Sequence, residues 1–245
     1  MIGIKAILFD LDGTLLPMDQ EVFMKLYFGQ LAVRLAPFGY EPKTLIDSVF
    51  AGIKAMVKND GSRTNEQAFW ERFSEFHGQD CRKDEPIFDA FYRNEFAKAK
   101  EACGVQPKAK EVIEFLKAKG KTIILATNPL FPQIATENRI RWAGLSPEDF
   151  LFYTTYEHSS YCKPNPKYYE EILNRAGLLP EECLMVGNDV GEDMVAETIG
   201  INVFLLTDCL LNPKQLEYAH YPQGGFEELL EYIKELCQVE LTSSI

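Results

Sequence analysis

Residues 6–17, AILFDLDGTLLP, combine an apolar segment with two closely spaced aspartates. The stretch opens with a run of apolar residues, which is typical of a strand that helices cover on both faces. Two carboxylates follow at once, Asp10 and Asp12, and then come Gly13 and Thr14. Carboxylates this close repel each other, and a cation relieves that repulsion. The stretch therefore predicts a buried parallel strand that delivers an acidic pair to one edge of a sheet.

From about residue 106 to the C-terminus, helical and extended patterns alternate. The expected helices span residues 111–118, 134–145, 164–178, 191–200 and 225–236, and the expected strands span 122–128, 150–155, 182–189 and 201–207. Several of these strands are continuously apolar, as in a sheet that is buried on both faces. The alternation predicts an α/β fold with a doubly wound, Rossmann-like parallel sheet.

The segment between the first two strands differs from the rest of the chain. Residues 17–105 show long helical patterns, many aromatic residues and no convincing buried strand. This segment interrupts the alternating pattern directly after the first strand. We therefore expect two domains, an α/β core made of residues 1–16 and 106–245 and an inserted α-helical domain made of residues 17–105.

Composition narrows the class of protein and its partners. The 245 residues are 46% hydrophobic and 25% charged, and the formal net charge is −12. A broad negative field repels nucleic acid and anionic membranes. No apolar run approaches the roughly 18 residues of a membrane span. We therefore expect a cytoplasmic globular protein that binds neither nucleic acid nor membranes.

Polar side chains follow several separate segments of the predicted sheet. Ligands of doubly wound sheets bind at the carboxyl ends of the strands, near the point where the strand order reverses. The side chains expected at this edge are Asp10 and Asp12, Thr127 and Asn128, Lys163, and Asp189. Their convergence predicts an active site.

Four short motifs resemble those of the haloacid dehalogenase superfamily, most members of which are magnesium-dependent phosphatases. They are DLDGT at 10–14, LATN at 125–128, KPNP at 163–166 and NDVGED at 188–193. The resemblance covers the predicted core, whereas the helical insertion matches only in place and type. It implies that the insertion is the cap that such enzymes carry after their first motif.

The resemblance also implies a role for each catalytic side chain. Asp10 attacks phosphorus to form an aspartyl-phosphate, and Asp12 protonates the leaving oxygen and later deprotonates the attacking water. Thr127 donates a hydrogen bond to a phosphoryl oxygen, Lys163 neutralises the charge of the nucleophile and the phosphate, and Asn128 also binds the substrate. The chain would thus hydrolyse a small phosphorylated metabolite, as a monomer or homodimer.

A Mg²⁺ cofactor is implied by the same motifs. Asp10, the backbone carbonyl of Asp12 and the side chain of Asp189 would supply hard oxygen ligands. Asp193 would orient waters or the site lysine. One position departs from the common pattern, because Asn188 stands between the glycine and the first acid. The division of roles among Asn188, Asp189 and Asp193 therefore stays open.

Other reactions on the same core remain alternatives. Dehalogenases of the superfamily lack the second aspartate, so Asp12 argues against dehalogenation. A phosphomutase or a phosphonate hydrolase on the same core stays an alternative. A non-catalytic binding module would normally have lost one of the four motifs, and none is missing here.

Overall fold

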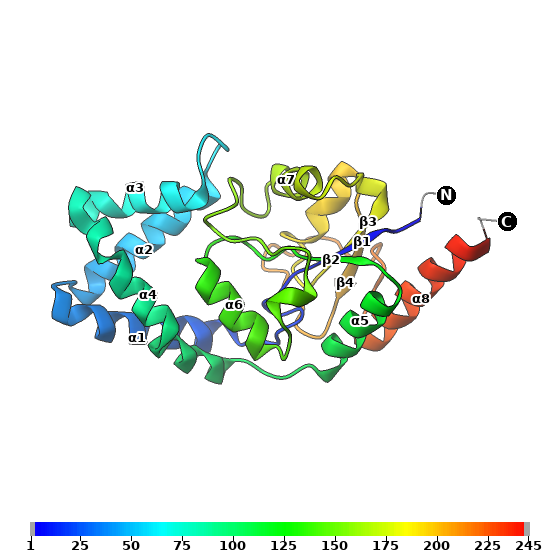
Figure 1. The fold of residues 1–245 in the computed structure, drawn as a ribbon, viewed down its shortest axis with the longest axis horizontal. Coiled ribbons are helices and arrows are strands. Elements are labelled where there is room, and N and C mark those ends of the chain that lie inside the picture. Colours follow the sequence, from blue (N-terminus) through cyan, green and yellow to red (C-terminus); the bar gives the residue numbers. More distant parts are fainter. Residues whose placement is uncertain (1–2, 243–245) are drawn as a thin grey trace.

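One parallel sheet forms the centre of the molecule in the computed structural model, which describes residues 3–242 (Figure 1). Its strand order is β2-β1-β3-β4-β5, and all the pairings are parallel. The strands are β1 (Ala6–Phe9), β2 (Thr122–Leu125), β3 (Cys183–Gly187), β4 (Asn202–Leu206) and β5 (Gln223–Gly224). The order reverses at β1, which lies between β2 and β3. The predicted doubly wound α/β fold is confirmed.

Alternate side chains of each strand face two different helical layers. Ile7 and Phe9 of β1 pack in one apolar cluster with helices α5 and α8, whereas Ala6 and Leu8 pack in another cluster with α7. Both sets are buried, which explains why the strand sequence is continuously apolar. The helices of the core are α5 (Pro107–Ala118), α6 (Gln133–Trp142), η4 (Pro147–Asp149), α7 (Pro166–Ala176), η5 (Pro180–Glu182), η6 (Met194–Ile199) and α8 (Phe226–Thr242).

Between β1 and β2 the chain forms a group of helices at one end of the molecule, which we call the helical insertion (Figure 1). Its elements are α1 (Gln20–Leu35), η1 (Ala36–Phe38), α2 (Pro42–Val57), α3 (Asn65–His77), η2 (Gln79–Asp84), α4 (Glu85–Arg93) and η3 (Glu95–Ala102). These helices share an aromatic-rich apolar cluster. Phe131, Ile134 and Trp142, which belong to α6 and the loop before it, pack against the same cluster. The insertion and α6 therefore bury apolar surface together.

Three elements differ from the sequence prediction. Residues 150–155 form only a single bridge, Tyr153 to Leu125, at the free edge of β2. The expected helix over 191–200 is the short 3₁₀ helix η6, and the two-residue strand β5 was not predicted. Among the described residues, no helix combines the length and the apolar character that crossing a membrane requires.

Candidate active site

Asp10 and Lys163 meet at the carboxyl end of β1. Asp10 follows the last residue of β1 and is 8% exposed, and Lys163 is 1% exposed. Lys163 Nζ donates to Asp10 Oδ1 at 2.8 Å and to Asp193 Oδ1 at 2.6 Å. One buried ammonium thus joins two carboxylates that come from different strand ends.

Local structure fixes the position of this lysine. Asn165 caps α7 by accepting a hydrogen bond from the backbone N–H of Lys167, and Pro166 begins the helix. Lys163 therefore precedes the helix in a defined loop rather than on a mobile surface. Burial opposes the positive charge of Lys163, but Asp10 and Asp193 raise the pKa of its ammonium well above the usual value. Lysine at this position is a fixed cation.

The environment of Asp193 is set by the same ion pair. Burial raises the pKa of the Asp193 carboxyl to about 7, although Lys163 opposes the shift. Asp193 Oδ2 accepts a hydrogen bond from the Asp189 backbone N–H at 2.9 Å. Both oxygens of Asp193 are thus engaged by protein donors. Asp193 is placed as the partner of Lys163.

The Thr14 hydroxyl lies between the second oxygen of Asp10 and the amide oxygen of Asn188. Thr14 Oγ1 is 3.2 Å from Asp10 Oδ2 and 2.9 Å from Asn188 Oδ1. Asn188 Nδ2 donates to the Cys209 carbonyl at 2.7 Å, which turns the amide oxygen of Asn188 toward Thr14. A hydroxyl has one proton and can serve only one of the two oxygens at a time. Carboxylate and amide oxygens grouped in this way fit a hard cation such as Mg²⁺.

Asp189 is oriented differently from Asn188. Its Oδ1 accepts hydrogen bonds from the backbone N–H groups of Gly191 at 2.7 Å and Glu192 at 2.9 Å, so this carboxylate closes its own loop. No three His, Cys, Asp or Glu side chains within residues 3–242 form a group that could hold a metal ion. The predicted set includes the backbone carbonyl of Asp12, which a group of side chains would not contain, so the assignment of Asp10, Asp12, Asp189 and Asp193 to a metal site stays a prediction.

Asp12 faces a residue that the sequence analysis did not select. Its Oδ2 pairs with Nη1 of Arg139, a side chain of α6 that is 1% exposed. Burial raises the pKa of the Asp12 carboxyl, and the Arg139 guanidinium opposes this shift. Arg139 shares the buried face of α6 with Ala135, Thr136 and Ile140. Arg139 lies three or four residues from Ala135 and Thr136 along the helix, and therefore on the same buried face. A charged residue on a buried helix face was the signal that could have identified Arg139.

Thr127 and Asn128 follow β2 as predicted. Thr127 is 2% exposed, and its carbonyl accepts hydrogen bonds from Tyr168 Oη at 2.8 Å and Thr154 Oγ1 at 2.6 Å. Asn128 Nδ2 donates to Glu192 Oε2 at 3.0 Å, which links the loop after β2 to the loop after β3. Asn128 Oδ1 is buried without a hydrogen-bond partner among the described residues.

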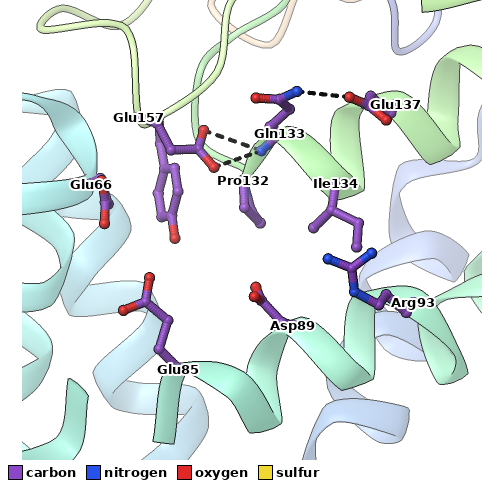
Figure 2. A pocket seen from close by; sticks show the side chains of 10 residues that line it. Glu66, Glu85, Asp89, Arg93, Pro132, Gln133, Ile134, Glu137 and Glu157 are labelled. Atoms are coloured by element: carbon purple, nitrogen blue, oxygen red, sulfur yellow. Dashed lines mark hydrogen bonds between the residues drawn. The ribbon is translucent and has the colours of Figure 1, made fainter. Parts of the chain in front are cut away.

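A pocket of about 330 Å³ opens between the helical insertion and α6 (Figure 2). Figure 2 shows acidic side chains from α3, α4 and the loop before α7 around it, against one arginine. The charged lining residues are Glu66, Glu85, Asp89, Arg93, Glu137 and Glu157. Glu157 also accepts hydrogen bonds from the N–H of Gln133 at the start of α6. So acidic a lining repels a phosphate group, and this pocket is therefore unsuited to bind one.

Comparison with known proteins agrees with this architecture. The family model of the haloacid dehalogenase-like hydrolases matches residues 4–196. No curated protein sequence matches the chain significantly.

Solved structures share the fold along nearly the whole chain. A HAD phosphatase from Thermococcus onnurineus has 19% sequence identity and a TM-score of 0.57, with 94% of this chain and 98% of that chain covered. A 2-haloacid dehalogenase from Pseudomonas syringae pv. Tomato DC3000 has 20% identity and a TM-score of 0.58, with 95% and 99% covered. A provisionally assigned β-phosphoglucomutase from Thermotoga maritima has 24% identity and a TM-score of 0.56, with 95% and 99% covered.

Identities this low establish a common fold but not a common reaction. The family model, in contrast, spans most of the chain and includes all four motifs. The chain belongs to the haloacid dehalogenase-like hydrolase family.

Proposed function

We propose that this protein is a Mg²⁺-dependent phosphatase that hydrolyses a small phosphate monoester through an aspartyl-phosphate. One observation carries the proposal. Asp10 lies beside the buried ammonium of Lys163, and a second aspartate stands two residues later. The first carboxylate supplies a nucleophile and the second supplies an acid and base.

The first step transfers the phosphoryl group to the protein. A carboxylate oxygen of Asp10 attacks phosphorus, and the bond from phosphorus to the leaving oxygen breaks. Asp12 gives its proton to that oxygen, so the product leaves as a neutral alcohol. Burial raises the pKa of Asp12, which favours the protonated form that this step requires.

The second step regenerates Asp10. Asp12, now ionised, takes a proton from water, and the water oxygen attacks phosphorus. The bond between phosphorus and Asp10 breaks, and inorganic phosphate leaves. Lys163, Thr127 and Asn128 are proposed to hold the phosphoryl oxygens in both steps, because a transferring phosphoryl group needs positioned donors.

A Mg²⁺ ion would bind beside Asp10. We assign to it the carboxylate of Asp10, the backbone carbonyl of Asp12 and oxygens from Asn188 and Asp189. When bound, the ion supplies charge that screens the two aspartates from each other and from the phosphate. Asn188→Ala and Asp189→Asn each remove one of these candidate oxygens. For each variant we would measure the Mg²⁺ concentration that gives half-maximal activity. The variant with the larger increase identifies the principal Mg²⁺ ligand of this loop.

Phosphate hydrolysis is favoured over dehalogenation by Asp12. A halide leaves without a proton, so a second carboxylate that is paired with a buried arginine has no use in that reaction. The helical insertion is proposed as the cap over the site. Residues 17–105 would then carry the contacts that select the substrate.

The test compares two reactions in one preparation. Purified protein with Mg²⁺ is assayed for phosphate release from a panel of small phosphate esters and for halide release from 2-haloacids. We expect phosphate release only, and its complete loss in Asp10→Asn. The matched control is Asp47→Asn, because Asp47 is an exposed aspartate that pairs with Lys43 on α2. Halide release, or phosphate release by Asp10→Asn, would contradict the proposal.

A further inference from the structure

Arg139 is a buried cation that the proposed reaction steps leave without a role. Its side chain is 1% exposed and lies in α6, outside the four motifs. Its ion-pair partner is Asp12. Arginine is rarely buried unless it is paired, because removing its charge from water costs several kcal/mol. The burial of this pair therefore calls for an explanation.

Contacts on three sides fix the direction of this guanidinium. Its Nε donates to the Ala135 carbonyl at 3.4 Å, and its Nη2 donates to Thr136 Oγ1 at 3.3 Å. Its Cζ lies 4.4 Å from the ring centroid of Phe131. When Nε and Nη2 are held in this way, the third nitrogen of the planar guanidinium, Nη1, can point in one direction only. Nη1 donates to Asp12.

The two oxygens of the Asp12 carboxylate therefore differ. Oδ2 is bound by Arg139, whereas Oδ1 is buried and has no hydrogen-bond partner within the described part of the chain. Arginine does not release its proton, so Oδ2 is unsuited to exchange one. A buried oxygen without a partner is costly unless a ligand completes it. Oδ1 is the oxygen left for proton transfer.

We propose that Arg139 is a positioning residue for the acid and base Asp12, an inference that rests on the phosphatase function proposed above. Arg139 anchors Oδ2 and thereby aims Oδ1 at the leaving oxygen of the substrate. When the ester bond breaks, the O–H bond at Oδ1 breaks as well, and its proton moves to the leaving oxygen. The electron pair stays on the carboxylate, beside the positive charge of Arg139. In the hydrolytic step Oδ1 takes a proton from water, which restores the acid.

The competing interpretation is structural: the pair only ties α6 to the segment after β1. The nature of the leaving group separates the two roles. An alkoxide must be protonated as it leaves, whereas dinitrophenolate leaves without a proton. Loss of acid positioning therefore slows an alkyl phosphate far more than a dinitrophenyl phosphate. A general structural defect slows both esters alike.

The experiment measures kcat/KM for an alkyl phosphate and for dinitrophenyl phosphate, with Mg²⁺ present. Arg139→Met is expected to lose roughly 10²-fold on the alkyl ester, the lower end for general acid catalysis, and less than about tenfold on the aryl ester. Arg139→Lys keeps the positive charge but lacks the planar guanidinium. Its loss of kcat/KM is also expected to be larger on the alkyl ester than on the aryl ester, but smaller than the loss in Arg139→Met. If Arg139→Met does not fold, Arg139→Lys alone carries the test. The control Arg141→Met alters an exposed arginine on the same helix, which pairs with Glu137, and should change neither rate.

A second readout uses the Asp12→Asn background. If Arg139 acts through Asp12, adding Arg139→Met to Asp12→Asn causes little further loss on the alkyl ester. Equal losses on both esters, or a full further loss in the double variant, would overturn the positioning role while leaving the phosphatase function intact. Absence of any phosphate release by the wild-type protein would overturn both proposals.

Discussion

Replacing Lys163 by methionine should destabilise the protein strongly, because it leaves two buried carboxylates without their common cation. Lys163 is 1% exposed, and its Nζ lies 2.8 Å from Asp10 and 2.6 Å from Asp193. Methionine keeps most of the apolar stem, so the loss is electrostatic rather than a cavity. Breaking a buried ion pair by removing one partner costs about 3–5 kcal/mol. We expect a loss of this size in the free energy of unfolding.

The measurement is urea unfolding at fixed pH and salt, followed by circular dichroism. The control is Lys98→Met, because Lys98 pairs with Glu101 at 2.6 Å but their side chains are 51% and 59% exposed. An exposed pair contributes at most about 1 kcal/mol, so this control should unfold nearly as the wild type does. The N···O distances of the two sites are similar, but Lys163 is buried and pairs with two carboxylates, whereas Lys98 is exposed and pairs with one.

A double variant tests the electrostatic reasoning. Asp193→Asn added to Lys163→Met removes one of the two uncompensated charges, so the double variant should be more stable than Lys163→Met. A loss below about 1 kcal/mol for Lys163→Met, or a further loss in the double variant, would refute the reasoning. Both variants are also expected to lack phosphatase activity.

Three further outcomes are expected. In Gly187→Ala the new methyl group overlaps the Asp193 carboxylate, so both stability and turnover should fall. In Gly29→Ala the methyl group meets nothing within 4 Å, so stability should rise by about 0.5–1 kcal/mol. Thermal unfolding measures both changes in stability. His77 Nε2 lies 2.8 Å from Ser48 Oγ, and burial lowers the pKa of the imidazole. The unfolded state therefore binds a proton at a higher pH than the folded state does. The free energy of unfolding should fall as pH drops below about 6.5, the usual pKa of histidine. His77→Gln should show a flatter stability curve between about pH 7 and 5, and an unchanged curve would contradict this assignment. Vanadate with Mg²⁺, as a phosphoryl mimic, should raise the unfolding temperature of the wild type, and no shift at saturation would argue against a preformed phosphate site.

The sequence predicted those parts of the fold that depend on local patterns. The strands at β1, β2 and β3 were recognisable because both of their faces are buried and their residues are continuously apolar. Residues 150–155 look equally extended, yet their backbone hydrogen bonds with β2 produce only a single bridge at the free edge of that strand. Nothing in their composition distinguishes a strand from an edge loop.

The candidate site was predictable in its residue types but not in its pairings. Asp10 and Lys163 each belong to one of the four motifs, and the structure brings the two side chains into contact. Asn188 and Asp189 are neighbours in sequence, and only the hydrogen bonds of the loop decide that the first faces Thr14 while the second binds its own backbone. Arg139 was missed because its partner lies 127 residues away in the chain. Such pairings arise from tertiary packing.

The shared apolar cluster between the helical insertion and α6 limits how this protein could be recombined. Phe131 packs edge-on against Phe23, and Trp142 lies 5.0 Å from Phe96, measured between ring centroids. A chimaera that exchanged residues 17–105 for the helices of a relative would remove these partners and leave the rings on the α6 side facing mismatched surfaces. Grafting a new specificity onto this scaffold would therefore require α6 and the loop before it to be transplanted with the insertion. The unit of exchange is larger than the segment between the first two strands.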